Sequence, residues 1–309
     1  MSRKGEIDAA LKKLAELEAG NPDERKAYAI RENIAFLEAA RSLPRYVWWL
    51  LTVAPKLDGS RLLELTDFPV EEWDVAMHTR LIELQKRKQP GLITPLVNAI
   101  TEYMREESRD LVIADLGAGG MEVDRQVAEW ALKANHPFRL TIVAVDKSPV
   151  TRRIADKNLK GLADDVEIVE TGELTARELE QMRQSTTKRL LIVMCTNDIF
   201  GLDQEFGSLY FDLVYHSLFR HHLNPAEQDR LDRTVRTVGK RHFEFDGYKS
   251  WSVVVPQTIV GWNHPHFLNG ELFSNLRFKE RQDIVTRAQG KRDASFYGTT
   301  GFYLLKYRD

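Results

Sequence analysis

The sequence predicts an α/β protein in which a doubly wound, mostly parallel sheet of seven strands follows a module made only of helices. Two observations lead to this fold class. Up to about residue 107 apolar residues recur at helical spacing, and from residue 111 continuous apolar runs alternate with helical patterns. Such runs are typical of strands buried on both faces of a parallel sheet. We therefore expect two domains, a helical module over residues 1–107 and a second domain over residues 108–309.

The N-terminal module shows helical periodicity with turn residues between its helices. In the first helix, apolar residues stand three and four apart, at Ile7, Leu11, Leu14 and Leu17. Turn residues at 20–23 and at Ser42–Pro44 separate this helix from two further helical stretches. Asp67–Trp73 and Pro90–Ile93 mark the starts of two more helices.

The second domain alternates strands and helices. Seven strands are predicted, at Leu111–Leu116, Leu140–Val145, Leu190–Cys195, Phe211–Tyr215, Arg241–Phe245, Ala294–Tyr297 and Phe302–Tyr307. Helices are predicted at Met121–Ala134, Pro149–Leu159 and Pro225–Val238. A further strand at Val166–Thr171 is an open alternative. Because strand and helix alternate, the crossovers should be right-handed and ligands should bind at the carboxyl ends of the strands.

Charge and hydropathy exclude several classes of protein. The 44 Lys and Arg residues nearly balance the 46 Asp and Glu residues, so the net charge of −2 argues against a dedicated nucleic-acid or anionic-membrane binder. Apolar stretches are too short to cross a bilayer, which takes about 20 consecutive apolar residues. The single Cys195 allows no intrachain disulfide. Since the first residues are charged and form no apolar targeting segment, we expect a cytoplasmic protein.

The strongest functional signal is an acidic, glycine-rich turn between the first strand and its helix. It contains Asp115, Gly117, Gly119 and Gly120, and glycines let the backbone approach a ligand closely. The next strand ends in Asp146, whose carboxylate could accept both hydroxyls of a ribose. Two adjacent strand ends of this kind predict a nucleoside site.

The pattern Asp115-x-Gly117-x-Gly119, with Asp146 after the second strand, resembles the S-adenosylmethionine site of class I methyltransferases. The resemblance extends over roughly residues 95–309 and implies a Rossmann-like methyltransferase fold with S-adenosylmethionine as its cofactor. In that family Asp115 and the glycines line the methionine and ribose, while Asp146, next to Lys147, holds the ribose hydroxyls. A cationic sulfonium cofactor without phosphates explains why the turn is acidic.

The segments at two further strand ends resemble segments of the same family. After the run at Leu190–Cys195, Asn197, Asp198 and Ile199 resemble an adenine clamp, in which the Asp198 carboxylate accepts the exocyclic amine and the Ile199 region packs on the ring. The segment from Asp212 onward is similar to one in small-molecule methyltransferases, including the quinone C-methyltransferase-like group. This similarity implies that His216 and Ser217 lie near the sulfonium.

A histidine pair follows the fourth predicted strand. His221 and His222 are the candidate catalytic residues, because an imidazole titrates near neutral pH and suits a general base that deprotonates a hydroxyl. The alternative is that they only satisfy a helix start. A zinc site is not expected, since the sequence shows no cysteine partner and no second group of ligands, so no metal is predicted.

The candidate substrate residues are aromatic and polar side chains downstream, namely Tyr248, Trp251, Trp262 and His264. Aromatics with interleaved polar groups suit an apolar, aromatic or polyketide-like acceptor. Core packing of the two tryptophans is an equally good interpretation. The stretch Tyr46–Trp49 has three interpretations: a lid, a dimer contact or the core of the helical module. The second of these would make the protein a homodimer.

Together these residues predict an S-adenosylmethionine-dependent methyltransferase acting on a small, apolar or aromatic organic acceptor, with O-methylation favoured over C-methylation. One alternative is a non-catalytic S-adenosylmethionine-binding partner protein. Another is a nicotinamide-dependent oxidoreductase. Glu122 weighs against it, because it replaces the third glycine of the dinucleotide fingerprint and would repel a pyrophosphate.

Overall fold

The computed structural model describes residues 3–58, 61, 91–134, 137–162, 165–223, 225–249, 278, 280–288, 292–297 and 301–307. The chain divides into two compact units. The helical unit contains Met1–Lys88, Gly247–Asp283 and Gly298–Gly301, and the sheet unit contains Gln89–Asp246, Ile284–Tyr297 and Phe302–Asp309. The functional domain boundary between residues 107 and 108 stays a prediction.

The helical unit begins with α1 (Arg3–Ala19), α2 (Glu24–Ala39), α3 (Leu43–Thr52) and the short η1 (Ala54–Lys56). Asp23 caps α2 by accepting a hydrogen bond from the Lys26 N–H at 2.8 Å. Pro44 lies in the first turn of α3, where a missing N–H carries no penalty. Tyr46 and Trp49 are buried in the core of this unit, which confirms that interpretation for these two side chains. The helix start expected at Asp67–Trp73 lies outside the described residues.

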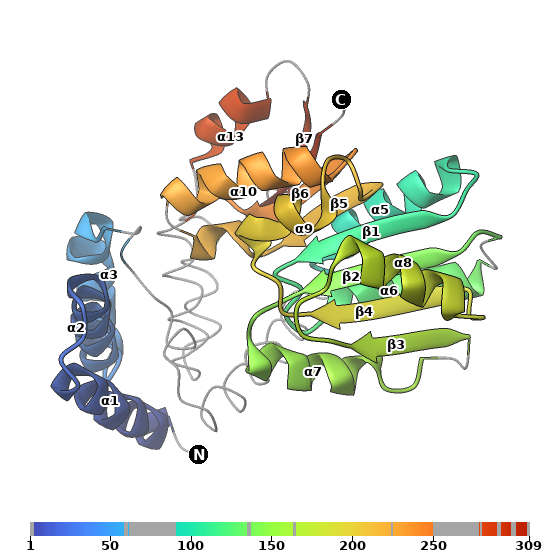
Figure 1. Ribbon diagram of the computed structural model, residues 1–309. Coiled ribbons are helices and arrows are strands. Elements are labelled where there is room, and N and C mark those ends of the chain that lie inside the picture. Colours follow the sequence, from blue (N-terminus) through green and yellow to red (C-terminus); the bar gives the residue numbers. More distant parts are fainter. Residues whose placement is uncertain are drawn as a thin grey trace. The chain divides into compact units, whose positions relative to one another are not determined.

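The sheet of the second unit has eight strands among the described residues, in the order β3-β4-β2-β1-β5-β6-β8-β7 (Figure 1). Their bounds are β1 Leu111–Leu116, β2 Leu140–Val145, β3 Val166–Glu170, β4 Leu190–Cys195, β5 Leu213–Ser217, β6 His242–Gly247, β7 Arg292–Tyr297 and β8 Phe302–Tyr307. The pairs from β3 through β6 are parallel, whereas β7 and β8 are antiparallel to each other. The predicted doubly wound, mostly parallel sheet is confirmed.

The number of strands and the bounds of β5, β6 and β7 differ from the prediction. An eighth strand, β3, pairs with β4 at the edge of the sheet, where only one neighbour is available and its side chains are partly exposed. The fourth predicted strand begins at Leu213, two residues later than expected. At Asp212 the side-chain carboxylate accepts the Val112 N–H at 2.8 Å, while the Asp212 N–H donates to the Val112 carbonyl, also at 2.8 Å.

Helices cover both faces of the sheet, as a doubly wound fold requires. One face carries α5 (Thr94–Glu106), α6 (Glu122–Lys133) and α7 (Pro149–Leu159), whose apolar residues belong to one core cluster. The other carries α8 (Ala176–Ser185), η4 (Ile199–Gly201), α9 (Leu202–Phe206) and α10 (Pro225–Val238). Within the described part of the chain, two further helices are η5 (Arg220–His222) and α13 (Arg281–Ala288).

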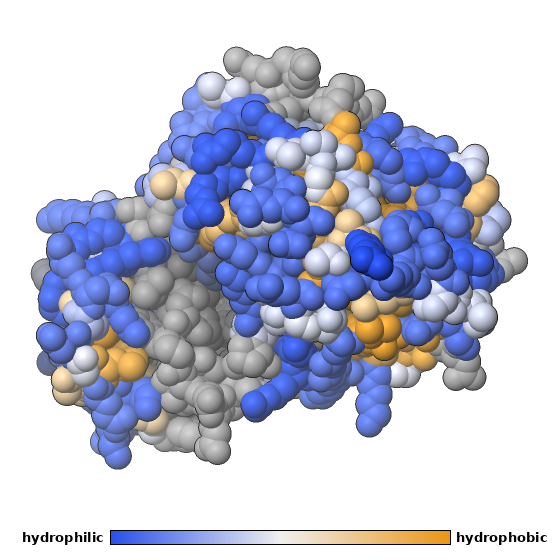
Figure 2. All heavy atoms as spheres, in the orientation of Figure 1, coloured by the Kyte–Doolittle hydropathy of each residue, from blue (hydrophilic) through white to orange (hydrophobic). Residues whose placement is uncertain are grey.

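The surface of the sheet unit is mostly hydrophilic in the view of Figure 2, with small hydrophobic patches. Among the helices that the structure describes, none has the length and apolar character needed to span a membrane.

Candidate functional site

Six parallel strands, β3, β4, β2, β1, β5 and β6, bring their carboxyl ends to one edge of the sheet. Leu116 of β1 pairs with Val145 of β2, and Val145 pairs with Cys195 of β4, so these three strands end level. On its other side β1 pairs with β5, which pairs with β6. The chain leaves β1 toward β2 and returns to the other side of β1 as β5, which makes this position the topological switch point where such sheets bind ligands.

The glycine-rich turn after β1 has backbone conformations that residues with a side chain would adopt only with strain. Gly117 has a φ of +72°, and a Cβ added to it would overlap the ring of Phe219. Gly119 has a φ of +53°, and the Gly120 carbonyl accepts a hydrogen bond from Asn158 of α7 at 2.7 Å. Met121, buried before α6, also adopts the left-handed conformation, at φ 57°. In this turn the Phe219 ring therefore packs against the Gly117 backbone, and Gly117, Gly119 and Met121 all have positive φ.

Asp146 ties this turn to the end of β2. Its Oδ2 accepts the Gly119 N–H at 2.8 Å, and its Oδ1 accepts the Ser148 N–H at 2.8 Å. A carboxylate has about four lone-pair sites, so both oxygens can accept further donors such as hydroxyls. A hydrogen bond therefore joins the glycine-rich turn after β1 directly to the carboxylate after β2.

Asp115 is a buried acid beneath the same turn, only 1% exposed. Its Oδ1 has no hydrogen-bond partner among the described residues. Burial, together with the neighbouring Asp124 carboxyl, raises the pKa of Asp115 well above its usual range. Tyr215 of β5 donates a hydrogen bond to Asp124 at 2.6 Å and fixes that second carboxyl. A cation next to Asp115 would favour its ionised form.

The loop after β4 lies beside the Asp146 loop, because β4 and not β3 is the neighbour of β2. Asn197 is buried, and its side chain accepts the Leu174 N–H and donates to the Leu174 carbonyl, both at 2.9 Å, so it holds the segment after β3 in place. Burial alone would raise the pKa of Asp198, but its ion pair with Lys147 at 3.0 Å and the Phe200 N–H lower it. Ile199 is buried beside this carboxylate.

His221 pairs with an aspartate at the end of β6. Its Nδ1 lies 2.7 Å from Asp246 Oδ1, and its backbone N–H donates to Asp246 Oδ2 at 3.1 Å. Both side chains are buried, and the ring of His222 lies 4.1 Å from that of His221 between centroids. When Nδ1–H donates to Asp246, the lone pair of a neutral imidazole is on Nε2. Asp246 was not among the predicted site residues, although it stands at a predicted strand end as Asp115 and Asp146 do.

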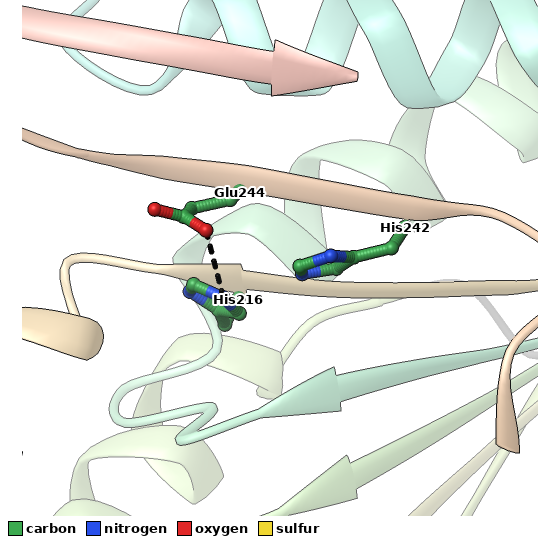
Figure 3. A group of neighbouring side chains, drawn as sticks. All are labelled: His216, His242 and Glu244. Carbon is green, nitrogen blue, oxygen red and sulfur yellow. Dashed lines mark ion pairs between the residues drawn. The ribbon is translucent and has the colours of Figure 1, made fainter. Parts of the chain in front are cut away.

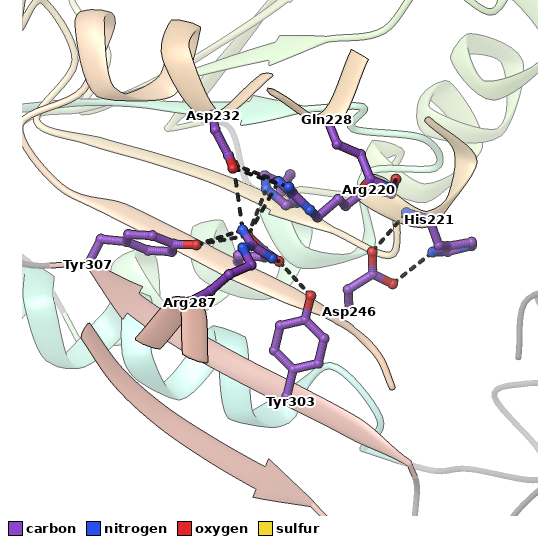
Figure 4. A network of polar contacts seen from close by, with 10 residues as sticks. Arg220, His221, Gln228, Asp232, Asp246, Arg287, Tyr303 and Tyr307 are labelled. Carbon is purple, nitrogen blue, oxygen red and sulfur yellow. Dashed lines mark hydrogen bonds and ion pairs between the residues drawn. The ribbon is translucent and has the colours of Figure 1, made fainter. Parts of the chain in front are cut away.

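A buried polar layer lies between β5, β6 and β8 on one side and α10 and α13 on the other. Glu244 of β6 accepts two hydrogen bonds from Arg287 of α13, at 3.1 and 3.0 Å. It also accepts hydrogen bonds from the hydroxyls of Tyr303 and Tyr307 of β8. Arg220, two residues before His222, donates two hydrogen bonds to the carboxylate of Asp232 in α10, at 2.6 and 3.1 Å (Figure 4). Sequence patterns gave no sign of this layer.

His216 of β5 belongs to this layer and is fully buried, with Glu244 3.9 Å from its Nε2. Ser217 follows it, partly exposed, at the end of the strand. Among the predicted substrate residues, Tyr248 is buried and its N–H donates to the Gly301 carbonyl at 2.8 Å. Trp251, Trp262 and His264 lie outside the described residues. The roles of all these residues toward a ligand stay predictions.

Comparisons with known proteins place methyltransferases among the structural neighbours. No protein-family model and no curated protein matches the sequence. Three neighbours are the plantazolicin methyltransferase BpumL in complex with SAH, an O-methyltransferase family protein from Burkholderia thailandensis, and the small RNA methyltransferase HEN1. BpumL is 9% identical over 77% of this chain and 91% of its own, with a TM-score of 0.49. The Burkholderia protein is 14% identical over 91% and 71%, with a TM-score of 0.45. HEN1 is 13% identical over 71% of this chain, with a TM-score of 0.46, and the match spans only 26% of HEN1.

Proposed function

We propose that this chain is an S-adenosylmethionine-dependent methyltransferase whose cofactor binds across the carboxyl ends of β1, β2 and β4. One observation carries the proposal, the hydrogen bond from the Gly119 N–H to Asp146. It joins an acidic glycine turn to a carboxylate suited to ribose hydroxyls, at the switch point of a doubly wound sheet. The residues present therefore fit an adenosyl group.

The charges around the turn favour a cationic cofactor over a dinucleotide. Glu122 and Asp124 lie in the first turn of α6, where a pyrophosphate would otherwise bind the helix N-terminus, and Asp115 lies near the end of β1. The partly exposed Glu122 carboxylate repels a pyrophosphate, and a cationic sulfonium or ammonium group beside Asp115 would favour the ionised form of that carboxyl. A nicotinamide-dependent oxidoreductase is therefore disfavoured.

The chemistry that the cofactor supplies is an electrophilic methyl group on a good leaving group. The protein's contribution is to position the acceptor in line with it, which can supply about 7–11 kcal/mol of the barrier. His221 removes the proton from an acceptor hydroxyl at Nε2, and Asp246 orients the ring and stabilises the imidazolium that forms. A hydroxyl is therefore the first candidate acceptor and a carbon the second.

The acceptor that we propose is a small apolar or aromatic molecule. Tyr248, Trp251, Trp262 and His264 are the residues proposed to bind it. No nucleic acid is proposed as the acceptor, since the net charge of −2 gives no long-range attraction to phosphates. A cytoplasmic location belongs to the same proposal.

The cofactor is tested by calorimetric titration of the purified chain with S-adenosylmethionine, S-adenosylhomocysteine and NAD. Binding of both adenosyl ligands at micromolar concentrations, without NAD, is the expected result. Binding of NAD alone would overturn the proposal. Binding of the adenosyl ligands without methyl transfer to any phenolic or polyketide acceptor would support the non-catalytic partner protein instead.

The base is tested once an acceptor is found. Replacing His221 with Ala should lower kcat by about 10²–10⁴-fold, and Asp246→Asn should lower kcat with little change in the cofactor's Kd. His222→Ala is the matched control on the adjacent imidazole. Unchanged turnover in His221→Ala would remove the histidine from the mechanism.

A further inference from the structure

We propose that His216, His242 and Glu244 form a binding site for one divalent first-row transition-metal ion such as Zn²⁺ or Co²⁺. The site lies in the sheet unit, and the proposal does not depend on the methyltransferase activity. It differs from the sequence-based expectation of no metal, because the three residues come from two strands that the sequence does not show to be paired.

The strand register brings the three side chains together. His216 of β5 lies directly opposite Glu244 of β6, and His242 stands two residues before Glu244, hence on the same face. One ligand atom from each residue lies within 4.8 Å of the others, and Figure 3 shows the two rings and the carboxylate gathered beside the strands. Metal–ligand distances of about 2.0–2.2 Å place ligand atoms roughly 3–4 Å apart. Small rotations of the side chains would therefore close the site around an ion.

Both histidines are buried without the hydrogen bonds that buried imidazoles normally make. His216 is 0% exposed and His242 is 4% exposed. Within the described part of the chain, neither ring nitrogen of His216 has a partner, nor does Nε2 of His242. Such atoms are rare in folded proteins and need an explanation. An ion coordinated by one nitrogen of each ring would give a partner to two of these three atoms.

The residue types at this place suit a transition-metal ion. Both imidazoles are buried beside the Glu244 carboxylate on the same face of the sheet. Imidazole nitrogens and carboxylate oxygens are common ligands of such ions. Two imidazoles and one carboxylate suit Zn²⁺, Co²⁺, Ni²⁺ or Fe²⁺, whereas Mg²⁺ and Ca²⁺ prefer sites made of oxygens.

Contacts around Glu244 both support the site and limit its affinity. The hydroxyls of Tyr303 and Tyr307 orient the carboxylate, as outer-shell partners of metal ligands do. Arg287 holds both carboxylate oxygens and brings a positive charge next to the ion. A metal therefore competes with this guanidinium for Glu244, and weakening the guanidinium should tighten metal binding.

The site is tested by titrating Co²⁺ into the chelator-treated, tag-free chain and following visible absorption. One Co²⁺ per chain is expected, with a ligand-field spectrum of nitrogen and oxygen ligands that Zn²⁺ abolishes and Mg²⁺ leaves unchanged. His216→Ala and His242→Ala should each weaken binding by at least about 10-fold. His222→Ala, which removes an imidazole outside the cluster, should bind as the unmodified chain does. Arg287→Met should bind more tightly.

A second measurement needs no variant. In the unmodified chain, Zn²⁺ should shift the imidazole NMR signals of two of the eight histidines. The proposal is overturned if the unmodified chain shows neither the Co²⁺ spectrum nor these shifts. Equal affinities in His216→Ala, His242→Ala and His222→Ala, with each variant folded by circular dichroism, would overturn it as well.

Discussion

Replacing Gly117 with Ala should destabilise the sheet unit by about 2–5 kcal/mol, more than the same replacement at Gly119. Two effects add. An L-residue at the φ of +72° costs about 1–2 kcal/mol. The new Cβ would stand 2.6 Å from Phe219 Cγ, well inside the 3.5–4.0 Å of ordinary carbon contact, and such overpacking costs about 1–3 kcal/mol.

Gly119→Ala is the matched control for the first effect. Gly119 also has a positive φ, +53°, but the nearest atom to its added Cβ is 3.9 Å away. Both variants are compared by urea unfolding followed by far-UV circular dichroism. The difference between them, about 1–3 kcal/mol, measures the contact with Phe219.

The contact between an added Cβ at residue 117 and Phe219 can also be removed by truncating Phe219. In a Phe219→Ala background, Gly117→Ala should cost about as much as Gly119→Ala does, because the ring no longer occupies the space. Equal effects of the two glycine substitutions in the unmodified chain would refute the reasoning, and so would an unchanged effect of Gly117→Ala in the Phe219→Ala background.

Three further predictions concern buried residues. Met121→Gly should destabilise the chain by up to about 4 kcal/mol in the same urea assay, because the loss of about 2–5 kcal/mol of buried packing exceeds about 1–2 kcal/mol of relieved left-handed strain. Asp115 has a raised pKa in the folded chain, so the folded state keeps a proton that the unfolded chain releases above about pH 4. Stability should therefore fall as the pH rises from there, and a pH series of unfolding curves should be flatter for Asp115→Asn; an equal slope would contradict this. Burial raises the pKa of the Cys195 thiol to about 11, so a thiol reagent at pH 8 should react with it only after unfolding.

Much of the sheet could be predicted because buried parallel strands are continuous apolar runs. The structure has β1, β2 and β4 at the predicted residues, and α7 and α10 also have the predicted bounds. β3 was left open because Val166–Glu170 alternates apolar and acidic residues at a partly exposed edge. α8 was missed, since Leu179 is the one side chain of that helix buried in the core and the other positions read as polar.

The candidate site was predictable where it depends on local chemistry. The turn at Asp115–Gly120 and the carboxylate of Asp146 carry their own signals, and the strand register brings them together. The pairing of His221 with Asp246 depends on how β5 and β6 align, which residue types do not encode. The buried layer around Glu244 was hidden because a charged residue inside a strand pattern does not reveal its partner on a distant helix.

The measurement that tests the nucleoside site most directly is the affinity of S-adenosylhomocysteine for Asp146→Ala. Asp165→Ala is its control, since Asp165 is an exposed carboxylate of the sheet unit ahead of β3. Losing hydrogen bonds to a charged group costs about 1.5–3 kcal/mol, or roughly 10–100-fold in affinity. We expect that loss in Asp146→Ala and micromolar binding by the unmodified chain and by Asp165→Ala. Unchanged affinity in Asp146→Ala, or no binding to the unmodified chain, would contradict the cofactor site proposed for this protein.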